Sequence, residues 1–320
     1  MVKSMKDYIN SQHRYYTLDY YLKNRFKSKV FKVALNGNFT CPNRDGKISH
    51  NGCIFCSPSG SGDFAGNPID SLETQFKQVS TIIHQKWHDA LYIVYFQANT
   101  NTYKPLNELK ELFEKAINLD EKIVCISIAT RPDCLPDEVI EYLSELNKRI
   151  PVWIELGLQT ANDKTGEFIN RGYNKDVFVN ALKKLRKHNI ETIVHIINGL
   201  PYETADDMYE TINFLNTLDI QGIKIHSLFV LKNTVLEKIY LENKFKMQSM
   251  DEYVQITANQ LALLRDDIVI HRINGDAPSD LLIAPDWSIK KLVVMNEIDK
   301  YMKKHNLFQG CNYKGSYNKN

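Results

Sequence analysis

The chain has 320 residues, of which 43% are hydrophobic and 24% charged, a composition typical of a globular protein with a sizeable core. The polar N-terminus lacks the apolar segment of a secretory signal, and no apolar run approaches the roughly 20 residues that span a bilayer, so we expect a cytoplasmic protein. The net charge of +2 is uneven: residues 1–50 carry ten Lys/Arg against three Asp/Glu, and residues 287–320 carry seven against two. These basic ends suggest a polyanionic partner, although solvated lysines on terminal helices explain them equally well.

Tyrosines are interleaved with lysine and arginine in residues 13–32. Aromatic faces beside cationic groups are typical of surfaces that bind single-stranded RNA. The alternative is an amphipathic helix whose tyrosines dock on the rest of the protein.

From residue 30 onward, apolar β-branched runs alternate with stretches of helical period. The predicted strands are 30–36, 91–97, 122–129, 152–159, 191–198 and 222–230, and the predicted helices between them are 71–88, 105–119, 137–149, 174–188 and 204–218. Ser71 and the pattern Thr204-x-x-Asp207 are helix start signals. The alternation predicts βαβ units and a parallel sheet.

Polar clusters follow or end nearly every predicted strand: a cysteine-containing loop comes first, then QANTNTY, ATRPD, ELGLQT, NGLPYE and KIHSL. A barrel gathers the C-terminal ends of its strands at one mouth, whereas an open sheet would not bring six such clusters together. We therefore predict an α/β fold, a partial (β/α)6 TIM-type barrel. A helix at 251–265, a short strand at 268–273 and a helix at 288–305 form a C-terminal extension that closes the barrel.

This organisation predicts three parts: a basic N-terminal segment at 1–29, the barrel at 30–235 and the extension at 236–320.

The stretch CPNRDGKISHNGCIFC contains Cys41, Cys53 and Cys56. Thiolates are soft ligands that favour zinc, copper(I) or iron–sulfur clusters. A structural zinc site would need a fourth protein ligand, which His50 could supply. A [4Fe–4S] cluster ordinarily has four thiolates, so three would leave one iron open for a cofactor or substrate. Both alternatives remain open on these residues alone. Cys125 is expected in the core, and Cys134 and Cys311 have no nearby cysteine in the sequence.

The loop resembles a variant of the radical SAM signature C-x3-C-x2-C, with Phe55 at the aromatic position before the last cysteine and a longer first spacing of eleven residues. This spacing resembles the elongator catalytic subunit group. The segments SIATRPDCLPDEVI, VWIELGLQT, INRGY, HIINGLPYET and KIHSLFVLKNT resemble that group in order and spacing. Residues 271–288 resemble its short bacterial YtqA/YhcC-type subgroup, so the resemblance covers nearly the whole chain.

The resemblance implies that Cys41, Cys53 and Cys56 hold a [4Fe–4S] cluster whose open iron binds S-adenosylmethionine. Cleavage of S-adenosylmethionine would give a 5′-deoxyadenosyl radical that abstracts hydrogen from the substrate. The implied substrate is the wobble-uridine side chain of tRNA, and the specific expectation is conversion of carboxymethylaminomethyl to aminomethyl. An electron donor such as flavodoxin or ferredoxin is also implied. The alternatives are a small-metabolite substrate and a zinc-stapled RNA-binding protein without catalysis.

Cofactor contacts are assigned by their position at the barrel mouth. They are Phe55, Gln97, Asn99, Thr100, Glu155, Gln159, Asn198 and Gly199. Glu155 and Gln159 share a strand face, and an unpaired buried carboxylate is costly, so we expect a cofactor contact there. Gly199 would let the backbone approach the adenosine closely.

Weaker candidates for substrate binding are Arg131, Arg171, Lys224, His226, His271 and Arg272. The first two would bind a carboxylate or phosphate by bidentate donation. Alternatively, Arg131 pins its own loop to Asp133, and the strand histidines are ordinary core residues. The sequence singles out no further catalytic residue.

Overall fold

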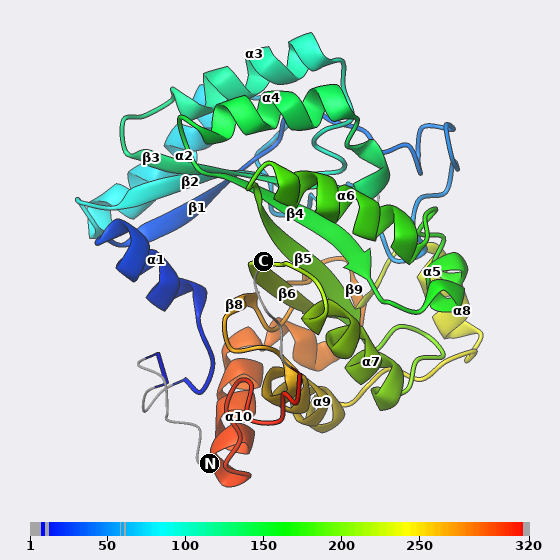
Figure 1. Ribbon diagram of the computed structural model, residues 1–320. Helices are drawn as coiled ribbons and strands as arrows, with labels where there is room; N and C mark the ends of the chain where they lie inside the picture. Colours follow the sequence, from blue (N-terminus) through cyan, green and yellow to red (C-terminus); the bar gives the residue numbers. More distant parts are fainter. Residues whose placement is uncertain (1–7, 10–12, 58, 61, 316–320) are drawn as a thin grey trace. The chain divides into compact units, whose positions relative to one another are not determined.

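A computed structural model describes residues 8–9, 13–57, 59–60 and 62–315 (Figure 1). The strands are β1 (Val30–Leu35), β2 (Leu91–Phe96), β3 (Ile123–Thr130), β4 (Val152–Gln159), β5 (Glu191–Asn198), β6 (Gly222–Ser227), β7 (Val230–Leu231), β8 (Val269–Arg272) and β9 (Leu282–Ala284). The α-helices are α1 (Leu18–Phe26), α2 (Leu72–Lys86), α3 (Leu106–Ile117), α4 (Asp137–Asn147), α5 (Asp163–Phe168), α6 (Lys175–Lys187), α7 (Ala205–Asn216), α8 (Val235–Leu241), α9 (Met250–Leu263) and α10 (Lys291–Lys304). Two short 3-10 helices are η1 (Pro132–Cys134) and η2 (Asp286–Ile289).

Seven strands form one sheet in the order β1-β2-β3-β4-β5-β6-β8. The pairs β1–β2, β2–β3, β3–β4 and β6–β8 are parallel. The α/β partial-barrel class predicted from the sequence is confirmed, and all six predicted strands occur. The region predicted as the extension also contributes to the sheet, because β8 pairs with β6 as a seventh strand.

The chain divides into two compact units, which are described separately. The cysteine-loop unit comprises residues 22–157 and 171–193, and the C-terminal unit comprises residues 1–21, 158–170 and 194–320. The three-part division of the chain proposed from the sequence stays a prediction.

In the cysteine-loop unit, helices α3 and α4 lie side by side over one face of the strands (Figure 1). The apolar positions of α3 recur at helical spacing, and Leu109, Phe113 and Ala116 are buried. Phe113 packs on Phe96 of β2, with 5.2 Å between ring centroids. Burying one such side chain contributes about 1.5–3 kcal/mol, so this layer stabilises β2, which pairs with the strand that the cysteine loop follows.

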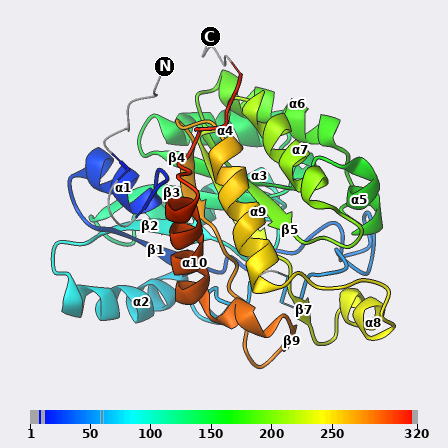
Figure 2. The same ribbon diagram turned by 90° about the horizontal axis from the view of Figure 1, so that it is seen from below.

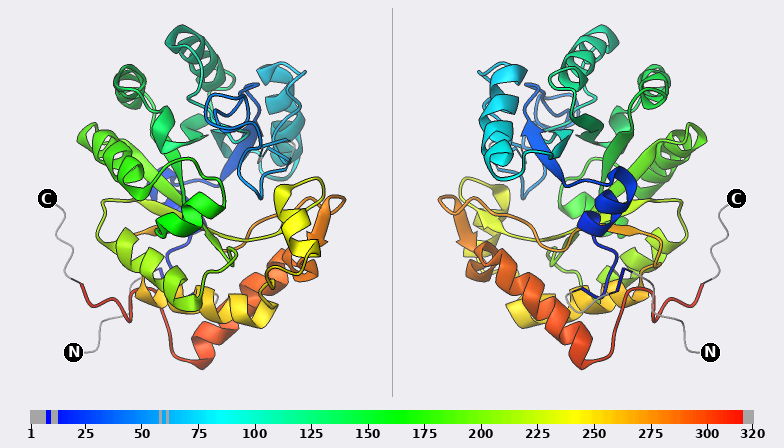
Figure 3. Two further views of the ribbon diagram at one scale, coloured as in Figure 1. Left: turned by 90° about the vertical axis from the view of Figure 1, so that its right-hand side faces the viewer. Right: turned by 90° about the vertical axis from the view of Figure 1, so that its left-hand side faces the viewer.

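In the C-terminal unit, α9 and α10 lie side by side (Figure 2). Helices α7 and α9 both begin with capping boxes, Thr204–Asp207 and Ser249–Glu252, the first of them predicted from the sequence. The strand predicted at 222–230 ends at Ser227, because the chain then turns into β7 and pairs with antiparallel β9. Figure 3 shows β9 (orange) next to α8 (yellow).

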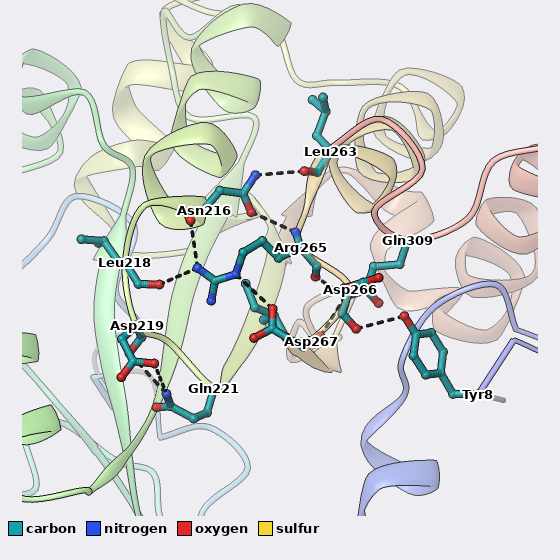
Figure 4. Close-up of polar contacts among 11 residues, drawn as sticks. Tyr8, Asn216, Leu218, Asp219, Gln221, Leu263, Arg265, Asp266, Asp267 and Gln309 are labelled. Atoms are coloured by element: carbon teal, nitrogen blue, oxygen red, sulfur yellow. Dashed lines mark hydrogen bonds and ion pairs between the residues drawn. The ribbon is translucent and has the colours of Figure 1, made fainter. Parts of the chain in front are cut away.

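A polar network around Arg265 joins the two terminal segments of this unit (Figure 4). The Arg265 side chain is 2% exposed and donates to the Asn216 carbonyl (2.8 Å) and to Asp267 Oδ1 (3.0 Å). Gln309 Nε2 donates to the Arg265 carbonyl (2.8 Å), and its Oε1 accepts from the backbone N–H of Tyr16 (2.8 Å). The buried charge is thus offset by hydrogen bonds, as a buried cation requires.

The N-terminal tyrosines pack on one another. Tyr15 is 3% exposed, Tyr8 stacks on Tyr16 with 4.7 Å between ring centroids, and Tyr20 meets Tyr16 edge-on at 6.0 Å. Tyr15 is thus buried, as the docked alternative expects, whereas Tyr16 and Tyr20 are half-buried. Across the described part of the chain, no helix is both long and apolar enough to cross a membrane.

Candidate functional site

The cysteine loop follows β1 as a series of turns fixed by its own backbone. The Arg44 N–H donates to the Cys41 carbonyl (2.8 Å), and the Cys56 N–H donates to the Cys53 carbonyl (3.1 Å). Gly52 has a φ of +69°, a conformation that favours glycine, and it turns the chain into Cys53. Local turns therefore fix how Cys53 and Cys56 lie relative to each other.

All six cysteines are free thiols. Within the loop, Cys53 and Cys56 share a side-chain hydrogen bond, and Asn43 Nδ2 donates to Cys53 Sγ (3.6 Å). The bond with Cys56, the charges of Arg131 and Arg171, and the Asn43 bond outweigh burial and lower the pKa of Cys53 to about 7. The same bond and burial raise the pKa of Cys56. Cys53 is thus the more acidic thiol of the pair, and the thiolate is the form that ligates metals.

Two buried arginines flank Tyr173 beside this loop. Arg131 donates from Nε and Nη2 to the two Asp133 carboxylate oxygens (2.9 and 2.8 Å) and from Nη1 to the Arg171 carbonyl (3.0 Å). The guanidinium carbons of Arg131 and Arg171 lie 4.9 and 5.0 Å from the Tyr173 ring centroid. Arg131 does pin its own loop to Asp133, the alternative considered for it.

The loop after β2 braces both ends of the cysteine loop. Asn99 Nδ2 donates to the Phe39 carbonyl (3.0 Å), and the Asn99 N–H donates to the Gly60 carbonyl (3.0 Å). The Thr100 N–H donates to the Thr40 carbonyl (3.2 Å). Predicted as cofactor contacts, these two residues hold the chain on either side of the three cysteines.

The same loop also reaches the ATRPD segment. The side chain of Asn101 donates to the Ala129 carbonyl (2.8 Å), and Thr102 Oγ1 donates to the Cys134 carbonyl (2.5 Å). Thr102 is 3% exposed and Asn101 is fully buried. The cysteine loop, the loop after β2 and the loop after β3 therefore form one hydrogen-bonded assembly.

The buried Glu155 of β4 has a half-buried cation as its partner. Lys32 Nζ of β1 lies 2.5 Å from Glu155 Oε1, and Ser127 Oγ of β3 donates to the same oxygen (2.8 Å). The Lys32 ammonium also lies 4.8 Å from the Tyr95 ring centroid. The carboxylate is thus satisfied within the protein, whereas the cofactor role was inferred from a carboxylate expected to be unpaired.

The remaining predicted residues of the cysteine-loop unit lie close to the loop. Phe55 is half-buried in the loop itself, and the Gln97 N–H donates to the Leu35 carbonyl (3.4 Å) at the end of β1. Cys125 is fully buried in β3, as expected for a core residue.

Three of the predicted cofactor residues belong to the C-terminal unit. Asn198 exchanges two hydrogen bonds with Gln260 of α9 (2.7 and 3.0 Å), so its amide is directed at that helix. Gly199 has a φ of +86° and lies against the Gln248 side chain. Gln159 ends β4 with a φ of +62°, which breaks the strand alternation used to place it on the face of Glu155.

The predicted substrate residues of the C-terminal unit lie on neighbouring strands. The rings of His195 (β5) and His226 (β6) are 5.2 Å apart. Lys224 of β6 is 4% exposed and is in register with Arg272 of β8. Arg272 Nη2 lies 3.4 Å from Asp276 Oδ2. His271 precedes Arg272 and is half-buried. These strands therefore carry a group of cationic and imidazole side chains.

Sequence reasoning missed three side chains that the structure places at the site: Asn43, Tyr173 and Lys32. The lysine was detectable, because a cation inside the apolar strand VFKVAL predicts a buried acidic partner. Nothing in the sequence indicated that Asn43 donates to a sulfur or that two guanidinium groups lie over the Tyr173 ring.

The zinc alternative required His50 as a fourth ligand. The His50 imidazole packs over Gly46, since a Cβ at that glycine would lie 2.4 Å from His50 Cε1. Within the described ranges, no group of three or more His, Cys, Asp or Glu side chains forms a ready-made site for a metal ion. The three thiolates that bind a [4Fe–4S] cluster need not meet at one metal ion, because each thiolate binds its own iron.

Comparison with known proteins identifies the family. The Radical SAM superfamily model matches residues 46–215, which include Cys53 and Cys56 and begin after Cys41, and the Radical_SAM C-terminal domain matches residues 220–304. Uncharacterized protein YtqA of Bacillus subtilis (strain 168) is 50% identical over 303 residues, covering 95% of this chain and 94% of that protein.

One more distant relative is named for an activity on tRNA. The tRNA uridine(34) acetyltransferase of Methanocaldococcus jannaschii is 23% identical over 209 residues, 64% of this chain, and the aligned part is only 37% of that protein. The solved structure of Methanocaldococcus infernus Elp3 with an N-terminal deletion has a TM-score of 0.67 at 17% identity, covering 88% of this chain and 64% of that one. This likeness shows the fold.

Proteins of this family use a [4Fe–4S] cluster and S-adenosylmethionine. The fold, the two family models and the half-identical relative agree. This chain therefore belongs to the radical SAM superfamily, and within it to a YtqA-type group.

Proposed function

We propose that this radical SAM enzyme modifies the side chain of the wobble uridine of tRNA in the cytoplasm, and that it converts a carboxymethylaminomethyl substituent to aminomethyl. The observation that carries the proposal is the similarity to a tRNA uridine(34) acetyltransferase over 64% of this chain. The basic ends of the chain add support, because tRNA is a polyanion.

We propose Cys41, Cys53 and Cys56 as the ligands of the cluster. The loop fits this group: it offers three thiols, the pKa of Cys53 is lowered to about 7, and Asn43 donates an N–H to its sulfur. Three ligands leave one iron for S-adenosylmethionine. When bound, the cluster and S-adenosylmethionine supply a 5′-deoxyadenosyl radical that abstracts hydrogen from the substrate, after an electron arrives from a donor such as flavodoxin or ferredoxin.

The chain's own residues would hold and shield this centre. The Asn99 brace fixes both ends of the cysteine loop, and the buried Phe39 and Ile54 exclude water beside it. Our proposed cofactor contacts remain Phe55, Gln97, Asn99, Thr100, Glu155, Gln159, Asn198 and Gly199.

The substrate end is proposed on β6 and β8. Lys224, His226, His271 and Arg272 offer cationic and imidazole groups that suit the carboxylate of the substituent or a tRNA phosphate. Arg131 and Arg171 are weaker candidates, because Arg131 donates from all three of its nitrogens to partners within the protein.

The proposed conversion balances with S-adenosylmethionine as the oxidant. The substituent loses its carboxymethyl group as glyoxylate when water is added and two electrons and two protons are removed. Reductive cleavage of S-adenosylmethionine to methionine and 5′-deoxyadenosine takes up two electrons and one proton. One 5′-deoxyadenosine and one glyoxylate should therefore form per aminomethyl group.

The test has two stages. The reconstituted, reduced protein is first assayed anaerobically for 5′-deoxyadenosine, with a Cys53→Ala variant as control. It is then incubated with tRNA from cells that lack the gene, and nucleosides and glyoxylate are quantified by mass spectrometry. We expect aminomethyl and glyoxylate to rise equally, and only with the native cysteines.

Unchanged wobble nucleosides alongside robust 5′-deoxyadenosine formation would refute the tRNA substrate and leave the chemistry intact. Bound zinc with no cleavage of S-adenosylmethionine would refute the cysteine assignment as well.

A further inference from the structure

Two arginine side chains are buried within the cysteine-loop unit. Arg131 is 8% exposed and Arg171 is 1% exposed, and Arg171 is among the largest fully buried side chains. Removing a guanidinium from water costs several kcal/mol unless partners compensate for it. Such a cost suggests that their positive charge serves a purpose at this place.

The segment that carries Arg171 packs directly against the cysteine loop. Gly172 has a φ of +81°, and a Cβ there would lie 3.2 Å from each of Arg131 Nη2, Asn43 Oδ1 and Ile48 Cγ2. Asn43 in turn donates to Cys53 Sγ (3.6 Å). Close packing at this glycine thus brings the Arg131 guanidinium to the loop that bears the thiols, and the Arg171 guanidinium lies over the same Tyr173 ring as that of Arg131.

The two arginines are held rigidly in this position. Both guanidiniums stack on the Tyr173 ring, whose hydroxyl donates to the Gly157 carbonyl (2.9 Å). Arg171 Nε donates to the Tyr173 carbonyl (2.8 Å), and Arg131 is fixed by both oxygens of Asp133. A fixed charge needs no reorganisation when the charge of its neighbour changes.

The positive charge of Arg131 lies next to a group that contacts a thiol. A cation fixed beside the Asn43–Cys53 hydrogen bond favours negative charge on this part of the loop. A [4Fe–4S] cluster gains one negative charge on reduction, and its potential depends on net charge, hydrogen bonds to sulfur and solvent exposure.

We propose that Arg131 and Arg171, stacked on Tyr173, raise the reduction potential of the cluster by stabilising its reduced, more negative state. The inference rests on the proposed cysteine ligands and goes beyond them, because it gives the two arginines an electrostatic role in place of substrate binding. Asp133 tempers this role, since its carboxylate offsets part of the charge of Arg131.

Redox titration of the reconstituted protein, followed by electron paramagnetic resonance without S-adenosylmethionine, tests the proposal. For Arg171→Gln we expect the oxidised-to-reduced ratio at a fixed potential to rise about tenfold, which is about 59 mV for one electron. Arg171→Lys keeps the charge and should stay near the native midpoint. Arg149→Gln removes an exposed arginine that is paired with Glu114, and it should leave the midpoint potential unchanged.

A second variant protects the test against misfolding of Arg171→Gln. Asp133→Asn changes an exposed residue, keeps one acceptor for Arg131 and removes the opposing charge, so the midpoint should move upward. Opposite shifts in the two variants cannot arise from a shared loss of structure.

The outcomes separate the two levels of the argument. If the native protein binds no [4Fe–4S] cluster, the proposed cysteine ligands are wrong and this inference is wrong with them. If every variant binds native amounts of iron and sulfide but the midpoints of Arg171→Gln and Asp133→Asn equal the native value, the arginine proposal alone is overturned. A shift in Arg171→Lys as large as in Arg171→Gln also overturns it, because shape rather than charge would then matter.

Discussion

Asn99 combines an unusual backbone conformation with a bond that the cysteine loop depends on. Its φ of +62° is tolerated by asparagine better than by other non-glycine residues, and its amide closes onto the Phe39 carbonyl. Gly60 has a φ of +63°, and a Cβ there would lie 1.9 Å from Asn99 Oδ1. The Asn99 side chain in this position therefore requires glycine at residue 60.

Substitution of Asn99 separates strain from bonding. Asn99→Gly loses the hydrogen bond, at about 1 kcal/mol, and adds freedom to the unfolded chain, at about 0.4–1 kcal/mol. Asn99→Ala loses the same bond and takes on left-handed strain of about 1–2 kcal/mol. We expect the alanine variant to be the less stable of the two in urea unfolding of the apo protein, and to retain less iron after reconstitution.

Asn189 is the matched control, because it is exposed and has a similar φ of +56° without bracing a loop. Asn189→Ala should show the strain alone and full iron retention. Equal losses at the two positions would contradict the bracing role of Asn99.

The Lys32–Glu155 pair yields a second prediction at this scale. Lys32→Met leaves a buried carboxylate without its cation and should cost about 3–5 kcal/mol in unfolding free energy. The double variant Lys32→Met/Glu155→Leu should recover much of that loss. Lys184→Met, which breaks the exposed pair with Asp137, should cost about 0–1 kcal/mol. If the double variant loses as much stability as Lys32→Met and Glu155→Leu lose together when measured singly, Lys32 and Glu155 are not coupled.

Among the elements, those with a strong period were predictable and those fixed by long-range pairing were not. β4 and β5 match their predicted bounds, because each is rich in apolar and β-branched residues. The two-residue β7 and the short β9 were missed, since each exists only through pairing with the other. The loop after β2 was located correctly, yet the inward turn of Asn99 toward Phe39 is a tertiary contact that no local pattern encodes.

The hydrogen bond between His13 and Asp299 should make the stability of the protein depend on pH. His13 lies 2.9 Å from Asp299 of α10, and this hydrogen bond raises the pKa of His13 despite partial burial. A raised pKa in the folded state adds stability that is complete below the ordinary value of 6.5 and is lost as pH rises through the folded value.

The melting temperature should therefore fall on going from pH 6 to pH 8.5, and part of that fall should disappear in His13→Asn. Asp299→Asn should remove the same part. A pH profile unchanged by either substitution would show that this pair does not link the terminal segment to α10.

Across the whole molecule, charge is separated along the chain, with basic ends and an acidic middle. Tyr8 and Tyr16 stack on each other and Tyr15 is buried. We therefore expect the lysines of the two basic ends, rather than these tyrosines, to contact RNA. Helix α10 illustrates this, because Lys300, Lys303 and Lys304 near its C-terminal end are exposed.

If tRNA is the substrate, as proposed, these lysines should act through phosphates. Lys303→Gln/Lys304→Gln should weaken tRNA binding for all sequences alike and reduce the slope of log K against log salt by about 0.7–0.9 for each phosphate that the variant no longer neutralises. Turnover at saturating tRNA should stay unchanged, because the substitutions lie outside the proposed cluster and substrate residues. Lys148→Gln serves as control, since Lys148 is exposed and paired with Glu145. An equal change of slope in the control would assign the effect to net charge and would remove α10 as a tRNA-binding element.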